Sequence, residues 1–114
     1  MLALSLIAWL KSAMASSNKG ELDQALADFD RVIQLNPKNA DGFFNRAVAL
    51  VRKHEYQRAV ADYSEAIALA PGLAAAYAGR GDALELTGQH EAAERDLKKA
   101  HDLYPSNQDH KLGP

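Results

Sequence analysis

The chain has 114 residues, of which 47% are hydrophobic and 25% charged, and its formal net charge at pH 7 is −2. This length and composition are those of one small globular domain rather than of a disordered chain. The charge offers no basic excess to neutralise a phosphate backbone, which argues against DNA or RNA as a partner. Because the chain has no cysteine, it can form neither disulfides nor thiolate metal sites.

Residues 1–15, MLALSLIAWLKSAMA, form an apolar run with two interpretations. An apolar core followed by Ala13-x-Ala15 resembles a signal peptide and its cleavage site, in which case the protein would be exported. A signal peptide should begin with positive charge, however, and the first basic residue here is Lys11, at the wrong end of the run. The run is also only about ten residues long, where a membrane span needs about 20. We therefore favour a folded helix in a cytoplasmic protein.

As a helix, this run carries more apolar side chains than one neighbouring helix can cover. Part of its surface must therefore contact something else, such as a groove of the folded protein, a ligand, a second copy of the chain or a preceding segment. If two copies meet through this end, the contact of like ends gives a closed two-fold dimer, since head-to-tail stacking would need apolar surface at both ends. The residues proposed for such self-association are Leu2, Leu6, Ile7 and Leu10.

An internal repeat organises the rest of the chain, because Pro37, Pro71 and Pro105 recur at intervals of 34 residues. Residues 6–39, 40–73 and 74–107 align at this interval. The aligned columns are Trp9, Phe43 and Tyr77; Ala13, Ala47 and Gly81; Gly20, His54 and Gly88; Leu22, Tyr56 and His90; Ala25, Ala59 and Ala93; Phe29, Tyr63 and Leu97; Val32, Ala66 and Ala100; Leu35, Leu69 and Leu103.

Each unit is predicted to be a helical hairpin. Apolar residues recur at helical spacing, as in Phe43, Ala47 and Leu50, and a polar or glycine-containing break such as RKHE or TGQHE separates two such segments. The column that contains Ala47 and Gly81 holds only small residues, which lets two helix axes approach to about 8 to 10 Å at this point. Proline ends the second helix, and the next hairpin starts at once so that its apolar face can stack on the previous one.

The last unit is predicted to cap the stack. Two columns of the second helices should face the following hairpin, and they change from apolar to polar only in the third unit. Terminal repeats need such a polar outer face for solubility. The two columns are Leu26, Val60 and Glu94, and Ile33, Ile67 and His101.

These columns resemble the tetratricopeptide repeat over residues 6–107, with the best agreement in the second and third units. The first unit departs from the family pattern at Ser12 and Ser16. The resemblance implies an all-α, right-handed α-solenoid of three stacked helix-turn-helix hairpins, six helices in all. It implies one domain over residues 1–107, followed by a tail over 108–114. It also implies a non-enzymatic scaffold or adaptor that binds a peptide or partner protein in a concave groove lined by the first helix of each repeat.

The positions that match the family's groove change in character along the chain. In the middle repeat they are apolar, with Asn45 and Arg52 beside Phe44 and Val48, whereas the last repeat is acidic. We expect the groove to accept a segment with an aliphatic or aromatic anchor flanked by a basic residue. The alternative is that Phe44 and Val48 only pack against neighbouring helices. The predicted groove residues are Leu10, Met14, Asp41, Phe44, Asn45, Val48, Val51, Arg52, Ala78, Asp82 and Glu85.

One specialisation of the family can be tested by position. Some members hold the C-terminal carboxylate of a chaperone tail with two lysines, two asparagines and one arginine. Of these five positions only Asn45 matches, which argues against a chaperone-tail adaptor. The other four positions are occupied by Leu10, Met14, Ala75 and Gly79.

No catalytic constellation, cofactor motif or metal site is recognised. The four histidines share no helix face, no glycine-rich phosphate loop follows a strand, and no serine has a paired histidine at recognisable spacing. Charged residues do recur in register, with Arg46 and Arg80 in one column and Asp28, Asp62 and Asp96 in another. They form either a ladder of ligand contacts or ion pairs between helices, and we favour the ion pairs.

Overall fold

The computed structural model describes residues 20–103, and every regular element within them is a helix. The all-α prediction is therefore confirmed over this range. The helical bounds follow the repeat, because the corresponding helices of the second and third units begin 34 residues apart. The helices are a first helix over residues 20–35, α2 (Ala40–Arg52), α3 (Tyr56–Leu69), α4 (Ala74–Leu86) and α5 (His90–Leu103).

The described residues contain five helices, where the repeat pattern predicts six. The remaining predicted helix, the first of the first unit, falls within residues 1–19 and so lies outside the described part of the chain. The same holds for the predicted tail over 108–114. Also outside are the groove residues Leu10 and Met14 and the self-association residues Leu2, Leu6 and Ile7.

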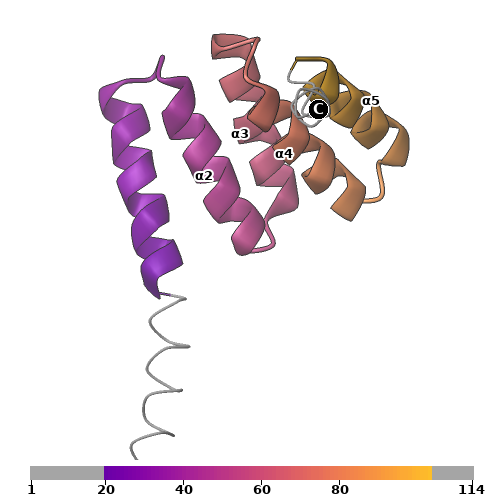
Figure 1. Cartoon of the computed structure of the whole chain (residues 1–114). Coiled ribbons are helices and arrows are strands. Elements are labelled where there is room, and N and C mark those ends of the chain that lie inside the picture. The colour runs from indigo at the N-terminus through magenta and orange to yellow at the C-terminus, as the bar shows by residue number, and fades with distance from the viewer. Residues whose placement is uncertain (1–19, 104–114) are drawn as a thin grey trace, which may run out of the picture.

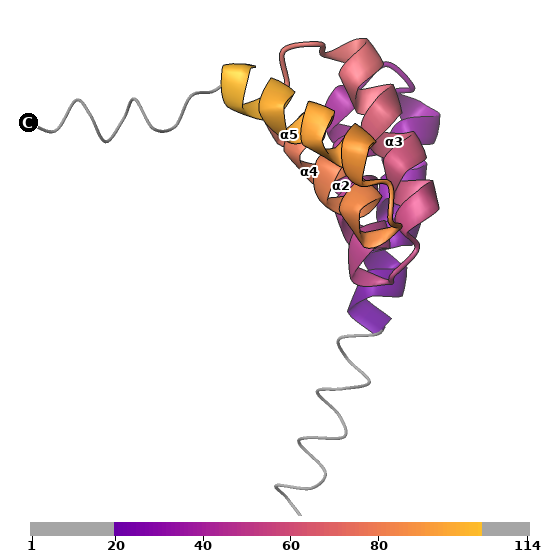
Figure 2. The same ribbon diagram turned by 90° about the vertical axis from the view of Figure 1, so that its right-hand side faces the viewer.

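The helices pack as successive antiparallel neighbours. Figure 1 shows them side by side, from the indigo 20–35 helix to the yellow end of α5, and Figure 2 shows α5 and α4 in front of the earlier helices. α2 pairs with α3, α4 pairs with α5, and α4 also contacts both helices of the preceding pair. On the other side of α2, a methyl group placed on Gly42 would lie 3.2 Å from Ile33 and 3.3 Å from Val32 of the 20–35 helix.

Local signals set the helix ends. The 20–35 helix and α3 each end two residues before a proline, at Pro37 and Pro71, as predicted. Asn39 then caps α2, since its side-chain oxygen accepts a hydrogen bond of 2.9 Å from the backbone amide of Asp41. The next hairpin can therefore start immediately after the previous one.

The core lies where small residues let helices approach. Ala47 of α2 and Ala59 of α3 are fully buried, and Leu50 and Tyr63 pack around them. At the position of Gly81, a methyl group would lie 2.9 Å from the side chain of Leu97 on α5. The prediction that this column serves close helix packing is therefore confirmed in the second and third units.

The two columns that become polar in the last unit are exposed on α5, although Leu97 and Leu103 of the same helix are also exposed. Leu26 and Ile67 pack against the core from their helices. At the corresponding positions of α5, Glu94 and His101 are exposed. Along these two columns, the change from apolar to polar side chains therefore accompanies a change from packed to exposed positions.

We expect Ala59→Leu to lower the free energy of unfolding by about 1 to 3 kcal/mol, because a fully buried site between α2 and α3 has no room for three further carbons. Urea denaturation measures this change. Ala61→Leu, at an exposed position of the same helix, serves as the control and should change stability little. An unaltered unfolding midpoint for Ala59→Leu would mean that the pairing of α2 with α3 is wrong.

The turns after α2 and α4 share one backbone geometry. His54 and Gly88, which occupy the same column, have φ values of 64° and 82°. In both turns, the backbone amides of this residue and of the next residue donate to carbonyl oxygens of the last helical turn. The amide of Glu55 donates to Leu50 O and the amide of Gln89 donates to Leu84 O, both at 2.9 Å. Glycine suits this conformation, whereas histidine adopts it at a cost.

We expect His54→Gly to raise the free energy of unfolding by about 0.5 to 1 kcal/mol, because the left-handed strain relieved exceeds the added entropy of the unfolded chain. The loss of the exposed 2.6 Å hydrogen bond between His54 Nδ1 and the Tyr56 hydroxyl should offset little of this gain. The reciprocal variant Gly88→Ala should lower stability by about 1 kcal/mol. Chemical denaturation of both variants checks the pair, and equal signs would contradict the expectation.

Candidate functional site

The predicted groove residues of α2 and α4 come together, because these two helices are in contact. Phe44, Val48 and Val51 are half-buried and pack against the core, and Ala78 is also half-buried. The polar members are exposed. They are Asp41, Asn45, Arg52, Asp82 and Glu85.

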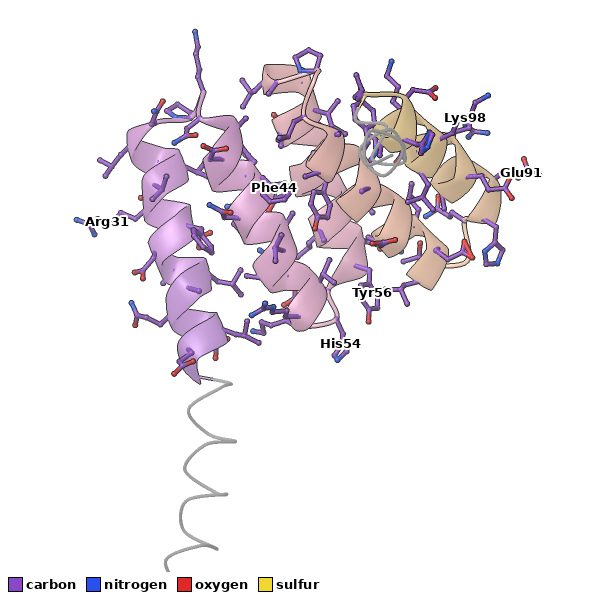
Figure 3. All side chains as sticks on the ribbon, in the orientation of Figure 1. Arg31, Phe44, His54, Tyr56, Glu91 and Lys98 are labelled. Atoms are coloured by element: carbon purple, nitrogen blue, oxygen red, sulfur yellow. The ribbon has the colours of Figure 1, made fainter. Side chains whose placement is uncertain are left out.

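Phe44 takes part in both the core and the surface. It lies on the side of α2 that faces α3 (Figure 3), and its ring meets the ring of Tyr63 edge-on, with 5.7 Å between centroids. Packing against neighbouring helices therefore accounts for part of the apolar character of Phe44 and Val48, as the alternative interpretation held. Since Phe44 and Val48 keep part of their surface accessible, they can still contact a ligand.

Two residues that were not among the predicted groove residues also belong to this face. They are Tyr63, which the sequence placed in a core column, and Gly79, which appeared only in the comparison with chaperone-tail binding. Tyr63 extends from α3 to α4, where a methyl group on Gly79 would lie 2.6 Å from its hydroxyl oxygen. Glycine is thus required at this close approach. The alignment of Tyr63 with Phe29 and Leu97 was the available signal, because only the middle repeat carries a hydroxyl in this column.

The α4 side of this face is acidic. Asp82 and Glu85 are exposed, and Glu85 Oε2 lies 2.8 Å from His90 Nδ1. Burial raises the pKa of Tyr63, and the negative charge of Asp82 raises it further. Tyr63 is therefore a neutral hydroxyl near a carboxylate at physiological pH.

A hollow of about 210 Å³ separates the 20–35 helix from α2. Leu22, Ala25 and Phe29 form its apolar side on the first helix, and Val48 faces them from α2. Asn45, Ala49 and Arg52 complete its lining. The predicted groove residues Asn45, Val48 and Arg52 thus line the same hollow as residues of the first unit that occupy the aligned repeat columns.

The recurrent arginines form ion pairs, as favoured from the sequence. The guanidinium of Arg46 donates to both carboxylate oxygens of Asp62, at 2.6 and 2.8 Å, and Arg80 does the same to Asp96 at the same distances. Each pair joins the two helices of one hairpin. The hydrogen bonds that Arg46 and Arg80 donate to Asp62 and Asp96 raise the pKa of the two arginines, so both are permanently charged.

Each arginine also reaches the preceding hairpin, which the sequence comparison missed. Nη1 of Arg46 donates to Asp30 at 2.9 Å, and Nη1 of Arg80 donates to Ser64 at 3.0 Å. Asp30 and Ser64 are 34 residues apart, so the repeat register was the signal for this contact. Asp28, the third member of the aspartate column, accepts instead from Gln24 of its own helix.

We expect Arg46→Leu to destabilise the protein by about 3 kcal/mol, because Asp62 is 6% exposed and would lose its countercharge. The double variant Arg46→Leu/Asp62→Leu should cost less than the single one, since both charges are then removed together. Thermal and urea denaturation check this order. Arg58→Leu, which breaks the exposed pair with Glu55, is the matched control and should change stability by about 0.5 kcal/mol or less.

Other kinds of site find no support between residues 20 and 103. No group of three or more histidine, aspartate or glutamate side chains within this range could hold a metal ion. His54 and Tyr56 pair with each other at the turn between α2 and α3 (Figure 3). Within the same range, no helix is both long and apolar enough to span a membrane.

The structure resembles several solved helical-repeat proteins. The first tetratricopeptide domain of Spaghetti (RPAP3), bound to the HSP90 peptide SRMEEVD, matches with a TM-score of 0.74 and 25% identity over 90% of this chain and 85% of that one. The OM64 domain from Arabidopsis matches with a TM-score of 0.75 and 27% identity, over 90% and 84% of the two chains. MamA matches with a TM-score of 0.73 and 26% identity, over 85% of this chain and 57% of that one.

Sequence comparison gives a consistent result. MJ0572, an uncharacterized protein of Methanocaldococcus jannaschii, is 40% identical over 42 residues, which are 37% of this chain and 49% of that protein. The alignment therefore spans about half of that relative. The sequence model described as tetratricopeptide repeat matches residues 10–74 and again residues 47–108. With the 34-residue spacing of its helix pairs, this coverage shows that the chain belongs to the tetratricopeptide repeat family.

Proposed function

We propose that this protein is a non-enzymatic interaction module that binds a segment of a partner protein on the face shared by α2 and α4. The observation that carries the proposal is the combination of half-buried apolar side chains, Phe44 and Val48, with the exposed carboxylates of Asp82 and Glu85 on contacting helices. A tetratricopeptide domain of similar fold is bound to a peptide in its solved structure, which supports this use of the fold.

The bound segment should carry an aliphatic or aromatic anchor beside a basic residue. Phe44 and Val48 supply apolar contact area, and Asp82 and Glu85 supply negative charge about one and two helical turns from Ala78. The HSP90 peptide bound by the Spaghetti (RPAP3) domain has two glutamates and an aspartate in its sequence SRMEEVD. At two of the positions where other family members hold a chaperone-tail carboxylate this chain has Ala75 and Gly79, so it lacks the cationic groups that would attract such an acidic ligand there.

The proposal includes a complete first repeat. Three hairpins in a right-handed stack, with six helices and one domain over residues 1–107, would place Leu10 and Met14 of the first unit beside α2. The hollow lined by Leu22, Ala25 and Phe29 supports this arrangement. The equivalents of Ala25 and Phe29 in the next unit are Ala59 and Tyr63, which are almost completely buried where α2 and α4 pack on α3.

Selection from a library of random peptides displayed on phage tests the proposed function. We expect the wild-type protein to retain peptides with the predicted pattern, and Phe44→Ala/Asp82→Lys to weaken their binding at least tenfold, because both the apolar contact and the charge are altered. Isothermal titration calorimetry with the selected peptides measures this. Glu91→Lys makes the same charge change at an exposed position of α5 (Figure 3) and should leave binding unchanged. Unaltered affinity of the double variant would contradict the proposal.

A second candidate, a structural unit that dimerises through Leu2, Leu6, Ile7 and Leu10, is favoured by the apolar run at residues 1–15. Light scattering over a wide concentration range separates the two. A complete first repeat that turns its apolar side chains inward should give a mass near 12.4 kDa. A persistent mass near twice that value would instead support the dimer.

A further inference from the structure

The hydroxyl of Tyr63 is the most unusual polar group on the face shared by α2 and α4. Tyr63 is only 4% exposed, and its hydroxyl makes no hydrogen bond with another residue in the described range. No side-chain nitrogen or oxygen in that range is both fully buried and unpaired, so the hydroxyl oxygen reaches the surface. A nearly buried ring therefore presents one unpaired polar atom to whatever lies outside.

Packing alone does not require this hydroxyl. The same column holds Phe29 in the first unit and Leu97 in the third, neither of which has a polar atom. The phenyl part of Tyr63 makes the edge-on contact with Phe44 without help from the oxygen. A phenylalanine would also fill the ring's space in the core, since the oxygen is the atom that reaches the surface.

Gly79 determines where the hydroxyl emerges. A methyl group at this position of α4 would lie 2.6 Å from the Tyr63 oxygen, so the absence of a side chain leaves room for the end of the Tyr63 ring against α4. Asp82 follows three residues later, which places its carboxylate on the same face of α4 about one turn away. Asp82 is exposed and forms no ion pair with a basic residue among those described.

We propose that Tyr63, Gly79 and Asp82 form a subsite for a lysine or arginine side chain of the bound segment. The cationic head donates hydrogen bonds to the Asp82 carboxylate and to the hydroxyl oxygen of Tyr63. Its aliphatic stem lies toward Phe44. This inference rests on the proposed function and adds to it the residue that selects the basic group.

A cation fits these groups better than an anion does. Asp82 offers only acceptors, and the hydroxyl can accept as well as donate, so a group with several donors satisfies both. The negative charge of Asp82 raises the pKa of Tyr63, which shows that the two groups share one electrostatic environment. An anionic side chain at the same place would meet Asp82 and Glu85 with like charge.

The test uses a lysine-containing peptide selected by the wild-type protein from the phage library, and the same peptide with lysine replaced by norleucine. Norleucine keeps the stem and removes the ammonium group. We expect the wild-type protein to bind the lysine peptide roughly tenfold more tightly than the norleucine peptide. Tyr63→Phe should remove most of this preference, because it weakens binding of the lysine peptide and leaves binding of the norleucine peptide unchanged. Asp82→Asn should have the same effect and should also make the affinity for the lysine peptide less dependent on salt concentration.

Tyr56→Phe is the matched control, because it removes a hydroxyl at the turn after α2, away from Gly79. It should leave both affinities unchanged. Circular dichroism melting of Tyr63→Phe checks that its fold is retained, and an unchanged affinity for the norleucine peptide shows the same in the bound state.

The outcomes separate the two proposals. If the library yields no peptide that the wild-type protein retains, both fall. If peptides bind but lack lysine and arginine, or if Tyr63→Phe binds the lysine and norleucine peptides as the wild type does, the subsite is wrong and the interaction module stands. Loss of the lysine preference in Tyr63→Phe, with Tyr56→Phe unaffected, supports the subsite.

Discussion

Close approach of paired helices at small residues is the constraint on which this structure depends. Ala47 and Ala59 are fully buried between α2 and α3, and Gly81 meets Leu97 and the backbone of Ala93 between α4 and α5. A larger side chain would separate the axes and expose the surrounding core. Because the same small residues recur every 34 positions, each hairpin has a similar shape and can stack on the one before it.

Charge then fixes how the hairpins meet. Arg46 and Arg80 are partly buried, and each donates to an aspartate of its own hairpin and to an oxygen of the preceding one. Each also lies over the ring of an aromatic residue one turn earlier, Phe43 or Tyr77, at 5.8 and 5.6 Å from its centroid. Buried charges are costly unless fully paired, so these contacts favour one register between neighbouring hairpins.

The same use of small residues creates the candidate binding face. Gly79 lies on α4 and lets Tyr63 reach it from α3. Phe44 supports the ring of Tyr63 while keeping part of its own surface accessible. The apolar part of the face is thus held rigidly by the core, and the exposed carboxylate of Asp82 stands beside it.

The sequence by itself determined the period, the helix pairs, their breaks and the polar last unit, because helical spacing, proline and glycine act locally and the repeat aligns them. It also indicated that arginines pair with aspartates. Only the tertiary structure decided that Asp30 and Ser64 join those pairs, that Phe44 belongs partly to the core, and that the Tyr63 hydroxyl emerges at Gly79. These facts depend on distances between residues on different helices, 16 or more positions apart in the sequence, which follow from the packing of helices and not from their individual patterns.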